Sequence, residues 1–157
     1  MKKGIQARDK MAYKFKFEGL LSYRKHLKEL AEVELSREQF KLRDNQDLLD
    51  NIKEDLQEAG RDLATGLRGT LSSDSIINYS EYISAQEIKI TLQEIEILKH
   101  EAMVEEKRKA LLEATKQFKI IEKLREKDSK KWKHKQLRRE QQEMNETAII
   151  RHGKEFL

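Results

Sequence analysis

The feature that most limits the fold of this chain is an apolar residue at every seventh position, in two runs separated by a glycine-rich segment. Leucine forms the first run, which Lys28 alone interrupts: Leu21, Leu35, Leu42, Leu49, Leu56 and Leu63. The second run is mostly isoleucine: Ile76, Ile83, Ile90, Ile97, Val104, Leu111 and Phe118. A period of seven predicts helices that pack against each other along a narrow seam. The sequence has no proline to break them, so we expect an all-α fold of two long helices.

Composition agrees with a coiled coil and excludes several other classes. Charged residues make up 39% of the 157 residues and hydrophobic residues 37%. Disorder is the alternative for such a charged chain, but the apolar columns favour helices. Without cysteine, neither a disulfide nor a thiolate metal site can form. The sequence contains neither a long apolar run nor a secretory signal, so we expect a cytoplasmic protein without direct membrane insertion.

The glycine-rich segment predicts a turn. Gly66 and Gly69 can end the first helix, and Ser72 to Asp74 offer N-caps for the second. A connection this short favours antiparallel neighbours. We therefore expect an elongated antiparallel two-helix coiled-coil hairpin over residues 17–152, with helices at about 17–65 and 75–152, a turn at about 66–74, and the second helix longer. Residues 1–16 form a basic extension that we expect to be partly disordered.

The second column of the first helix is less apolar than the leucine column. It reads Phe17, Arg24, Ala31, Glu38, Asn45, Ile52 and Ala59. A buried asparagine such as Asn45 can fix the register of a coiled coil at a cost in stability. The alternative is that Glu38 and Asn45 lean outward from a loose seam, and the sequence does not decide between the two.

Positive charge is concentrated in two segments. Residues 1–16 carry a formal charge of +5 and residues 123–139 carry +7, whereas the rest of the chain carries −8. An antiparallel hairpin brings these segments together at its open end. The result is either a docking site for an acidic surface or a solvated end screened by salt.

We find no catalytic, cofactor-binding or metal-binding constellation in the sequence, and we expect a protein that is not an enzyme. His100-Glu101 begins like a helical zinc motif, but Val104 stands where the second histidine is needed. The segment 66–69 lacks the lysine and hydroxyl residue of a phosphate-binding loop. The basic segment 130–135 surrounds Trp132, which is a pattern that can bind nucleic acid; no dimeric or folded reading module accompanies it.

Two stripes near the turn resemble partner-binding surfaces. They consist of Leu48, Ile52, Asp55 and Ala59 on the first helix and of Tyr82, Gln86, Lys89 and Gln93 on the second. Exposed aromatic residues on helices often anchor partners. Alternatively, the tyrosines of this region cover the turn.

Several segments, taken in order, resemble the FliJ family of flagellar type III export proteins. The aromatic and basic stretch 11–17 leads into Leu20 to Arg24, and Ile77 to Ile83 opens the second helix. Glu122 to Glu126 and the closing segment Asn145 to Arg151 follow. Residues 1–10 precede the usual start of the family, and Met144-Asn145 replace the acidic residue that often precedes the closing glutamate.

The resemblance implies a non-enzymatic coiled coil that acts as a central stalk of the hexameric flagellar export ATPase. It implies that the protein promotes assembly and activity of the ATPase, links it to the cytoplasmic part of the export gate, and escorts export chaperones at the inner membrane. Carried onto this sequence, the ATPase-binding candidates are Arg24, Lys116, Glu122, Lys123, Arg125 and Arg151. The gate-binding candidates are the two stripes near the turn. The alternatives are the stalk protein of a virulence secretion system and a basic coiled coil that binds nucleic acid.

Overall fold

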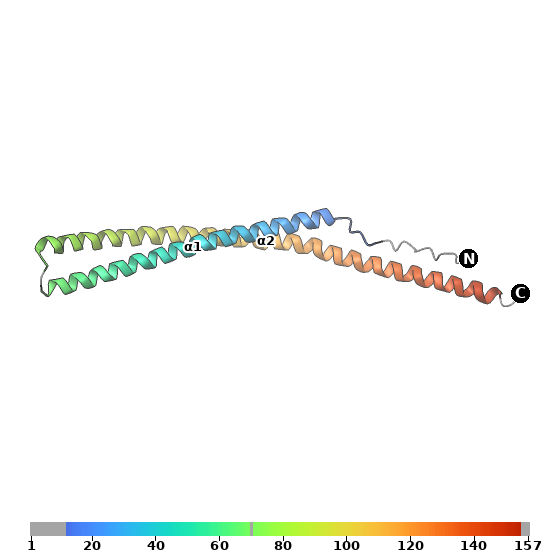
Figure 1. Cartoon of the computed structure of the whole chain (residues 1–157). Coiled ribbons are helices and arrows are strands. Elements are labelled where there is room, and N and C mark those ends of the chain that lie inside the picture. The colour runs from blue at the N-terminus through green and yellow to red at the C-terminus, as the bar shows by residue number, and fades with distance from the viewer. Residues whose placement is uncertain (1–11, 70, 155–157) are drawn as a thin grey trace, which may run out of the picture. The chain divides into compact units, whose positions relative to one another are not determined.

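The computed structural model describes residues 12–69 and 71–154, and within them it contains two α-helices and no strand (Figure 1). Helix α1 runs over Glu18–Leu67 and helix α2 over Ser73–Lys154, with 50 and 82 residues. The predicted all-α hairpin with a longer second helix is confirmed. The helix ends lie within two residues of those expected from the sequence.

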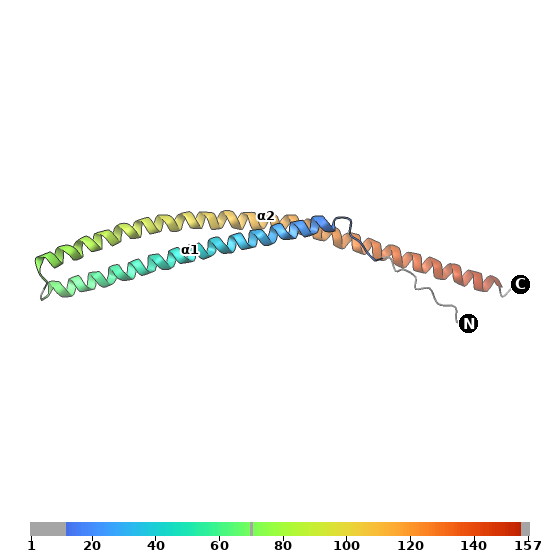
Figure 2. The same cartoon turned by 45° about the horizontal axis from the view of Figure 1, so that its top comes forward.

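The chain forms two compact units. Unit 1 combines Met1–His26 with Thr115–Leu157, and unit 2 is Leu27–Ala114. Unit 2 contains the turn and the part of each helix next to it. Within unit 2 the two helices lie side by side and run antiparallel (Figures 1 and 2).

The turn is built around Gly66. The backbone amides of Gly69 and Leu71 both donate to the Gly66 carbonyl, at 3.2 and 3.4 Å. A Cβ atom at residue 66 would collide with the side chain of Leu71. A larger residue at position 66 would therefore have to displace the side chain of Leu71, which folds back over the end of α1.

Helix α2 begins with a serine cap. The Ser72 side-chain oxygen accepts a hydrogen bond from the backbone amide of Ser75 at 3.3 Å, and the Ser72 carbonyl accepts one from the amide of Ile76 at 3.1 Å. Asp74 lies in the first turn, where its charge favours the positive end of the helix dipole. Among the three predicted caps, the structure selects Ser72.

The apolar columns line the seam of unit 2. Ile97 and Val104 are buried, and Leu42 and Leu49 are half-buried. Two helices cannot enclose a side chain on every side, and among the described residues no large side chain is fully buried. The seam therefore stabilises the hairpin through many partly buried contacts, not through a compact core.

The second column also faces the partner helix. Glu38 is 7% exposed, and Asn45 is half-buried and bonded to α2. Both residues thus lie in the seam, and the alternative that they lean outward is wrong. Phe17 in unit 1 was expected in this column, but it is 42% exposed because it precedes the first residue of α1.

Candidate partner-binding surfaces

The segment before α1 lies against α2 within unit 1. The Tyr13 hydroxyl donates to Asp128 Oδ2 at 3.0 Å and lies 3.2 Å from the carbonyl oxygen of Arg125. Its ring centroid is 5.9 Å from that of Trp132. Tyr13 therefore contacts α2 along two helical turns, within the basic stretch 123–139.

Two further contacts reinforce this segment. Phe15 is buried, and its ring meets that of Phe17 edge-on at 5.8 Å. Glu18 Oε2 lies 3.6 Å from Arg125 Nε, so the first acidic residue of α1 pairs with a candidate ATPase-binding residue. The sequence suggested that the basic segments meet, but it did not identify Tyr13 and Phe15 as the residues that hold them together.

The electrostatics of Tyr13 follow from these contacts. Loss of solvent around the ring, followed by the hydrogen bond to Asp128 and the charge of that carboxylate, raises the pKa of Tyr13 above its usual 10.0. The hydroxyl therefore remains a hydrogen-bond donor at neutral pH. Residues 1–11 lie outside the described residues, so the expectation that the extension is partly disordered stays a prediction for them.

All six ATPase-binding candidates fall in unit 1, but they do not form one patch. Lys116 and Lys123 are seven residues apart on α2 and share a face, whereas Arg125 points to the opposite side. Arg151 lies about 39 Å farther along α2 than Arg125 at 1.5 Å per residue. Arg24 is half-buried, and the other five are exposed.

The basic stretch of α2 is fully available at the surface of unit 1. All nine of its cations are exposed: Lys123, Arg125, Lys127, Lys130, Lys131, Lys133, Lys135, Arg138 and Arg139. Trp132 within this stretch is half-buried by Tyr13, so it continues the seam instead of presenting a free ring.

All eight gate-binding candidates fall in unit 2, and they divide into seam and surface residues. Four lie in the seam: Ile52, Ala59, Gln86 and Gln93, of which Ala59 and Gln86 are 7% and 5% exposed. Four lie on the outside: Leu48, Asp55, Tyr82 and Lys89. The exposed four can contact a partner directly, whereas the other four support the helix pair.

Polar contacts cross the seam of unit 2 at regular intervals. Gln93 Nε2 donates to Asn45 Oδ1 at 2.8 Å and to the Asn45 carbonyl at 3.0 Å. Lys107 Nζ donates to Glu34 Oε2 at 2.8 Å, and this carboxylate raises the pKa of Lys107. These pairs fix the register, because a shift of either helix would leave half-buried amides unpaired.

Glu38 is the acidic residue of this polar column. Its Oε1 accepts a hydrogen bond from Lys41 Nζ at 2.7 Å, and its Oε2 lies 3.6 Å from His100 Nδ1. The bond from Lys41, together with attraction to His100, lowers the pKa of Glu38 against the opposing effect of burial. A carboxylate enclosed by the seam thus stays ionised at neutral pH.

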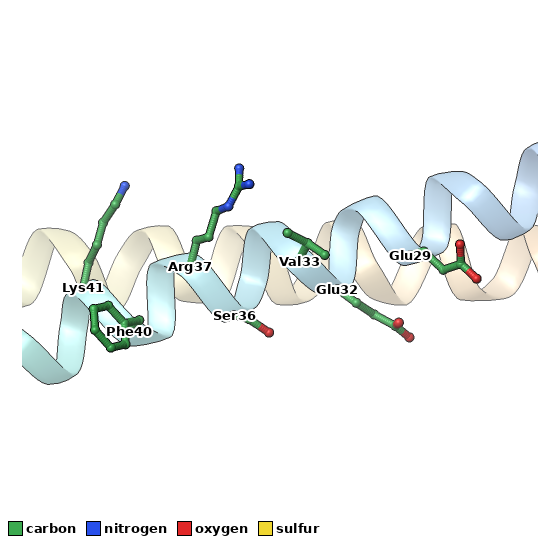
Figure 3. A pocket seen from close by; sticks show the side chains of 7 residues that line it. All are labelled: Glu29, Glu32, Val33, Ser36, Arg37, Phe40 and Lys41. Atoms are coloured by element: carbon green, nitrogen blue, oxygen red, sulfur yellow. The ribbon is translucent and has the colours of Figure 1, made fainter.

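An open hollow lies on the outward face of α1 in unit 2 (Figure 3). Val33 and Phe40 form its apolar part and are 48% and 63% exposed. Its lining is completed by Glu29, Glu32, Ser36, Arg37 and Lys41. Residues at these spacings form the holes that receive side chains of a neighbouring helix in coiled coils, but the mixed charges of this hollow select no particular partner.

Two kinds of site are absent from the part of the chain that the structure describes. No group of three or more histidine, aspartate, glutamate or cysteine residues could hold a metal ion there. In residues 12–69 and 71–154, neither helix has a stretch long and apolar enough to cross a membrane.

Comparisons with known proteins agree with the hairpin and with the order of its motifs. A solved structure described as a putative YscO homolog from Chlamydia trachomatis is 26% identical, with a TM-score of 0.50, over 90% of this chain and 96% of that one. No curated protein matches the sequence significantly. The model of the family described as flagellar FliJ protein matches residues 13–155. YscO is the type III secretion counterpart of FliJ, and both similarities support a type III export stalk protein. Because the family match spans nearly all of its length, the chain belongs to the flagellar FliJ family.

Proposed function

We propose that this chain binds the hexameric ATPase of the flagellar type III export apparatus as a central stalk, and that unit 1 makes this contact. The exposed basic stretch 123–139 carries the proposal, because a dense row of cations on one helix favours an acidic binding surface. Tyr13 and Phe15 hold the start of the described chain against α2, so that the exposed Lys14 and Lys16 can add their charge to that of the basic stretch.

The second part of the proposal concerns unit 2. The exposed residues Leu48, Asp55, Tyr82 and Lys89 contact the cytoplasmic part of the export gate, and the protein escorts export chaperones to it. The protein itself is non-enzymatic and reaches the inner membrane only through the apparatus. Family membership and the exposure of these four side chains support this part.

The test is ATP hydrolysis by the cognate flagellar export ATPase, with and without this protein, at constant salt. We expect stimulation and a co-eluting complex. Reversal of two charges in Lys123→Glu/Arg125→Glu should weaken binding at least about tenfold, because two favourable charge contacts become repulsive. The helices should remain folded, since both side chains are exposed and the Arg125–Glu18 ion pair that the change removes is a surface pair.

A matched control separates local contact from net charge. Arg43→Glu/Arg61→Glu makes the same change in charge on exposed positions of unit 2. This control should bind and stimulate the ATPase like the wild type. Equal loss in both variants, or no loss in the unit 1 variant, would refute the proposed contact.

The virulence secretion stalk remains the second candidate, because the solved neighbour is a YscO homolog. Stimulation of a virulence ATPase but not of the flagellar one would favour it. Binding of DNA or RNA of any sequence, with affinity that falls steeply with salt, would favour the nucleic-acid alternative instead.

A further inference from the structure

The outward face of α2 in unit 2 carries an apolar stripe that the proposed function does not use. Ile88, Leu92, Ile95 and Leu98 are 63%, 61%, 47% and 63% exposed. The first three follow the spacing i, i+4, i+7, so they lie in one row on the helix surface. Ile97, in contrast, points into the seam and is 9% exposed. Helix α2 therefore has two apolar faces, of which one has no partner within this hairpin.

The charges beside the stripe form a pattern that complements itself. Lys89 is exposed and Glu96 is half-exposed. They lie seven residues apart, along the same edge of the stripe. In a two-fold antiparallel pair of helices, equal edges face each other. Lys89 then lies opposite Glu96 of a second copy, and Glu96 lies opposite Lys89 of that copy, so the ion pair forms twice.

The same register places apolar side chains in the centre. With the two-fold axis between residues 93 and 94, Leu92 packs on Ile95 of the second copy and Ile95 on its Leu92. Ala85 lies opposite Ala102, which allows close approach of the helices. A shift that brought Lys89 opposite itself would create like-charge repulsion at the centre of the contact, whereas in this register like charges meet only at its outer ends, where Glu81 lies opposite Glu106.

The remaining charged residue of the stripe is compatible with this pairing. Lys99 Nζ is already bonded to Glu96 Oε2 at 2.9 Å, and its aliphatic stem can lie along Ile88 of the second copy. The same lysine lowers the pKa of Glu96, so this carboxylate is ionised at neutral pH. Glu96 can therefore accept from both lysines.

We propose that the outward face of α2 around Leu92 and Ile95 binds a second copy of this chain, with the two α2 helices antiparallel. A second copy is the occupant that this face fits, because the Lys89 and Glu96 charges along its edge complement themselves in the two-fold pair. The contact spans few helical turns, and we expect a reversible dimer. The proposal uses only contacts in unit 2. It does not depend on the proposed export function, although the dimer and the proposed gate contact would compete for Lys89.

The experiment is sedimentation velocity of the full chain over a concentration range from about 1 µM to about 1 mM. We expect the wild type to shift from monomer to dimer within this range. Lys89→Glu should weaken the dimer about tenfold, because two ion pairs become two repulsive pairs. Glu96→Lys should do the same.

Mixing the two variants gives the sharpest test. In the mixed dimer, one chain presents two glutamates and the other two lysines along the edge, so both pairs become attractive. The equimolar mixture should recover wild-type association, although each variant alone does not. Circular dichroism checks that both variants keep the helix content of the wild type.

Two more variants assign the surface. Leu92→Gln should abolish the dimer, whereas Phe40→Ser, which removes an apolar side chain from the outward face of α1, should leave it unchanged. A wild type that stays monomeric at all concentrations would overturn the proposal. So would a dimer that is indifferent to Leu92→Gln, or a mixture that associates no better than its components.

Discussion

Glu38 is buried in the seam, although glutamate is usually an exposed residue. A glutamate avoids burial unless it is paired. Here Lys41 donates a hydrogen bond to Oε1, and His100 Nδ1 lies 3.6 Å from Oε2. His100 Nε2 also lies 3.9 Å from Glu96 Oε1, so the histidine stands between two carboxylates. The polar column thus links the two helices through the close approach of Glu38 and His100 as well as through the amide hydrogen bonds of Asn45 and Gln93.

The lowered pKa of Glu38 makes the free energy of unfolding depend on pH. Because the folded state holds this pKa below its usual 4.5, the ionised carboxylate stabilises the fold above that pH, and this contribution is lost as the pH falls through the folded value. In urea unfolding from pH 7 down to pH 3, we expect Glu38→Gln to be less stable than the wild type at neutral pH, with a difference that shrinks on acidification. A difference that stays constant with pH would show that the charge of Glu38 does not contribute.

At the scale of the element, the end of α1 and the start of α2 at the turn are stabilised by different interactions. Gly66 lies in the last turn of α1 and leaves room for Leu71, and Ser72 caps α2 by accepting a hydrogen bond from the amide of Ser75. The Ser72 and Ser75 hydroxyl oxygens are also 2.9 Å apart and share a hydrogen bond. Both interactions are local, which is why short-range sequence signals placed this turn correctly.

Loss of the Ser72 cap should weaken the hairpin measurably. Ser72→Ala leaves a helix N-terminal amide without its acceptor, and we expect a loss of about 1 kcal/mol in the free energy of unfolding. The neighbouring variant Ser73→Ala removes an exposed hydroxyl from the first turn and serves as the matched control. Equal effects of the two variants in chemical denaturation would contradict the assignment of Ser72 as the cap.

At the scale of the whole molecule, the side chains that stabilise the hairpin and those that we propose to bind partners lie on separate parts of each helix surface. The seam of unit 2 uses Leu42, Leu49, Ile97 and their column neighbours, whereas the outward faces carry Phe40 and the stripe around Leu92. Substitutions in the seam should therefore weaken folding, whereas substitutions on the outward faces should weaken partner binding and leave the fold intact.

Adjacent leucines on α1 test this division. Leu49→Asp places a charge in the seam and should cost about 2–4 kcal/mol, enough to unfold much of unit 2. Leu48→Asp makes the same change one residue earlier, where the side chain is 49% exposed, and should keep wild-type helicity. Far-ultraviolet circular dichroism and thermal melting compare them; similar melting of both would refute the seam register.

The periodic part of the fold could be predicted from sequence, because seven-residue spacing specifies which helix face is covered. Ile52 and Ala59 belong to the second column of α1, so the seven-residue pattern already placed them in the seam. The second column of α2 was hidden, since Gln86, Gln93 and His100 are polar and look like surface residues. Their burial depends on partners across the seam, which a single helix does not reveal.

The segment around Tyr13 was not predictable in detail for a different reason. It has no helical period, and its contacts with Asp128 and Trp132 join residues more than one hundred positions apart. Likewise, family resemblance could select Arg24, Lys116 and Arg125 as candidates, but only the structure places Arg125 beside Glu18 and on the opposite side of α2 from Lys116.

The short turn between Leu67 and Ser73 has a consequence for how strong the seam must be. Because it tethers the helices, each meets its partner at an effective concentration in the millimolar range, independent of the amount of protein present. A half-polar interface that would be too weak to join two free helices at cellular dilution is then sufficient within one chain. The turn thus allows this protein to keep amides and charges in its seam, and with them a single register, without requiring a more apolar interface.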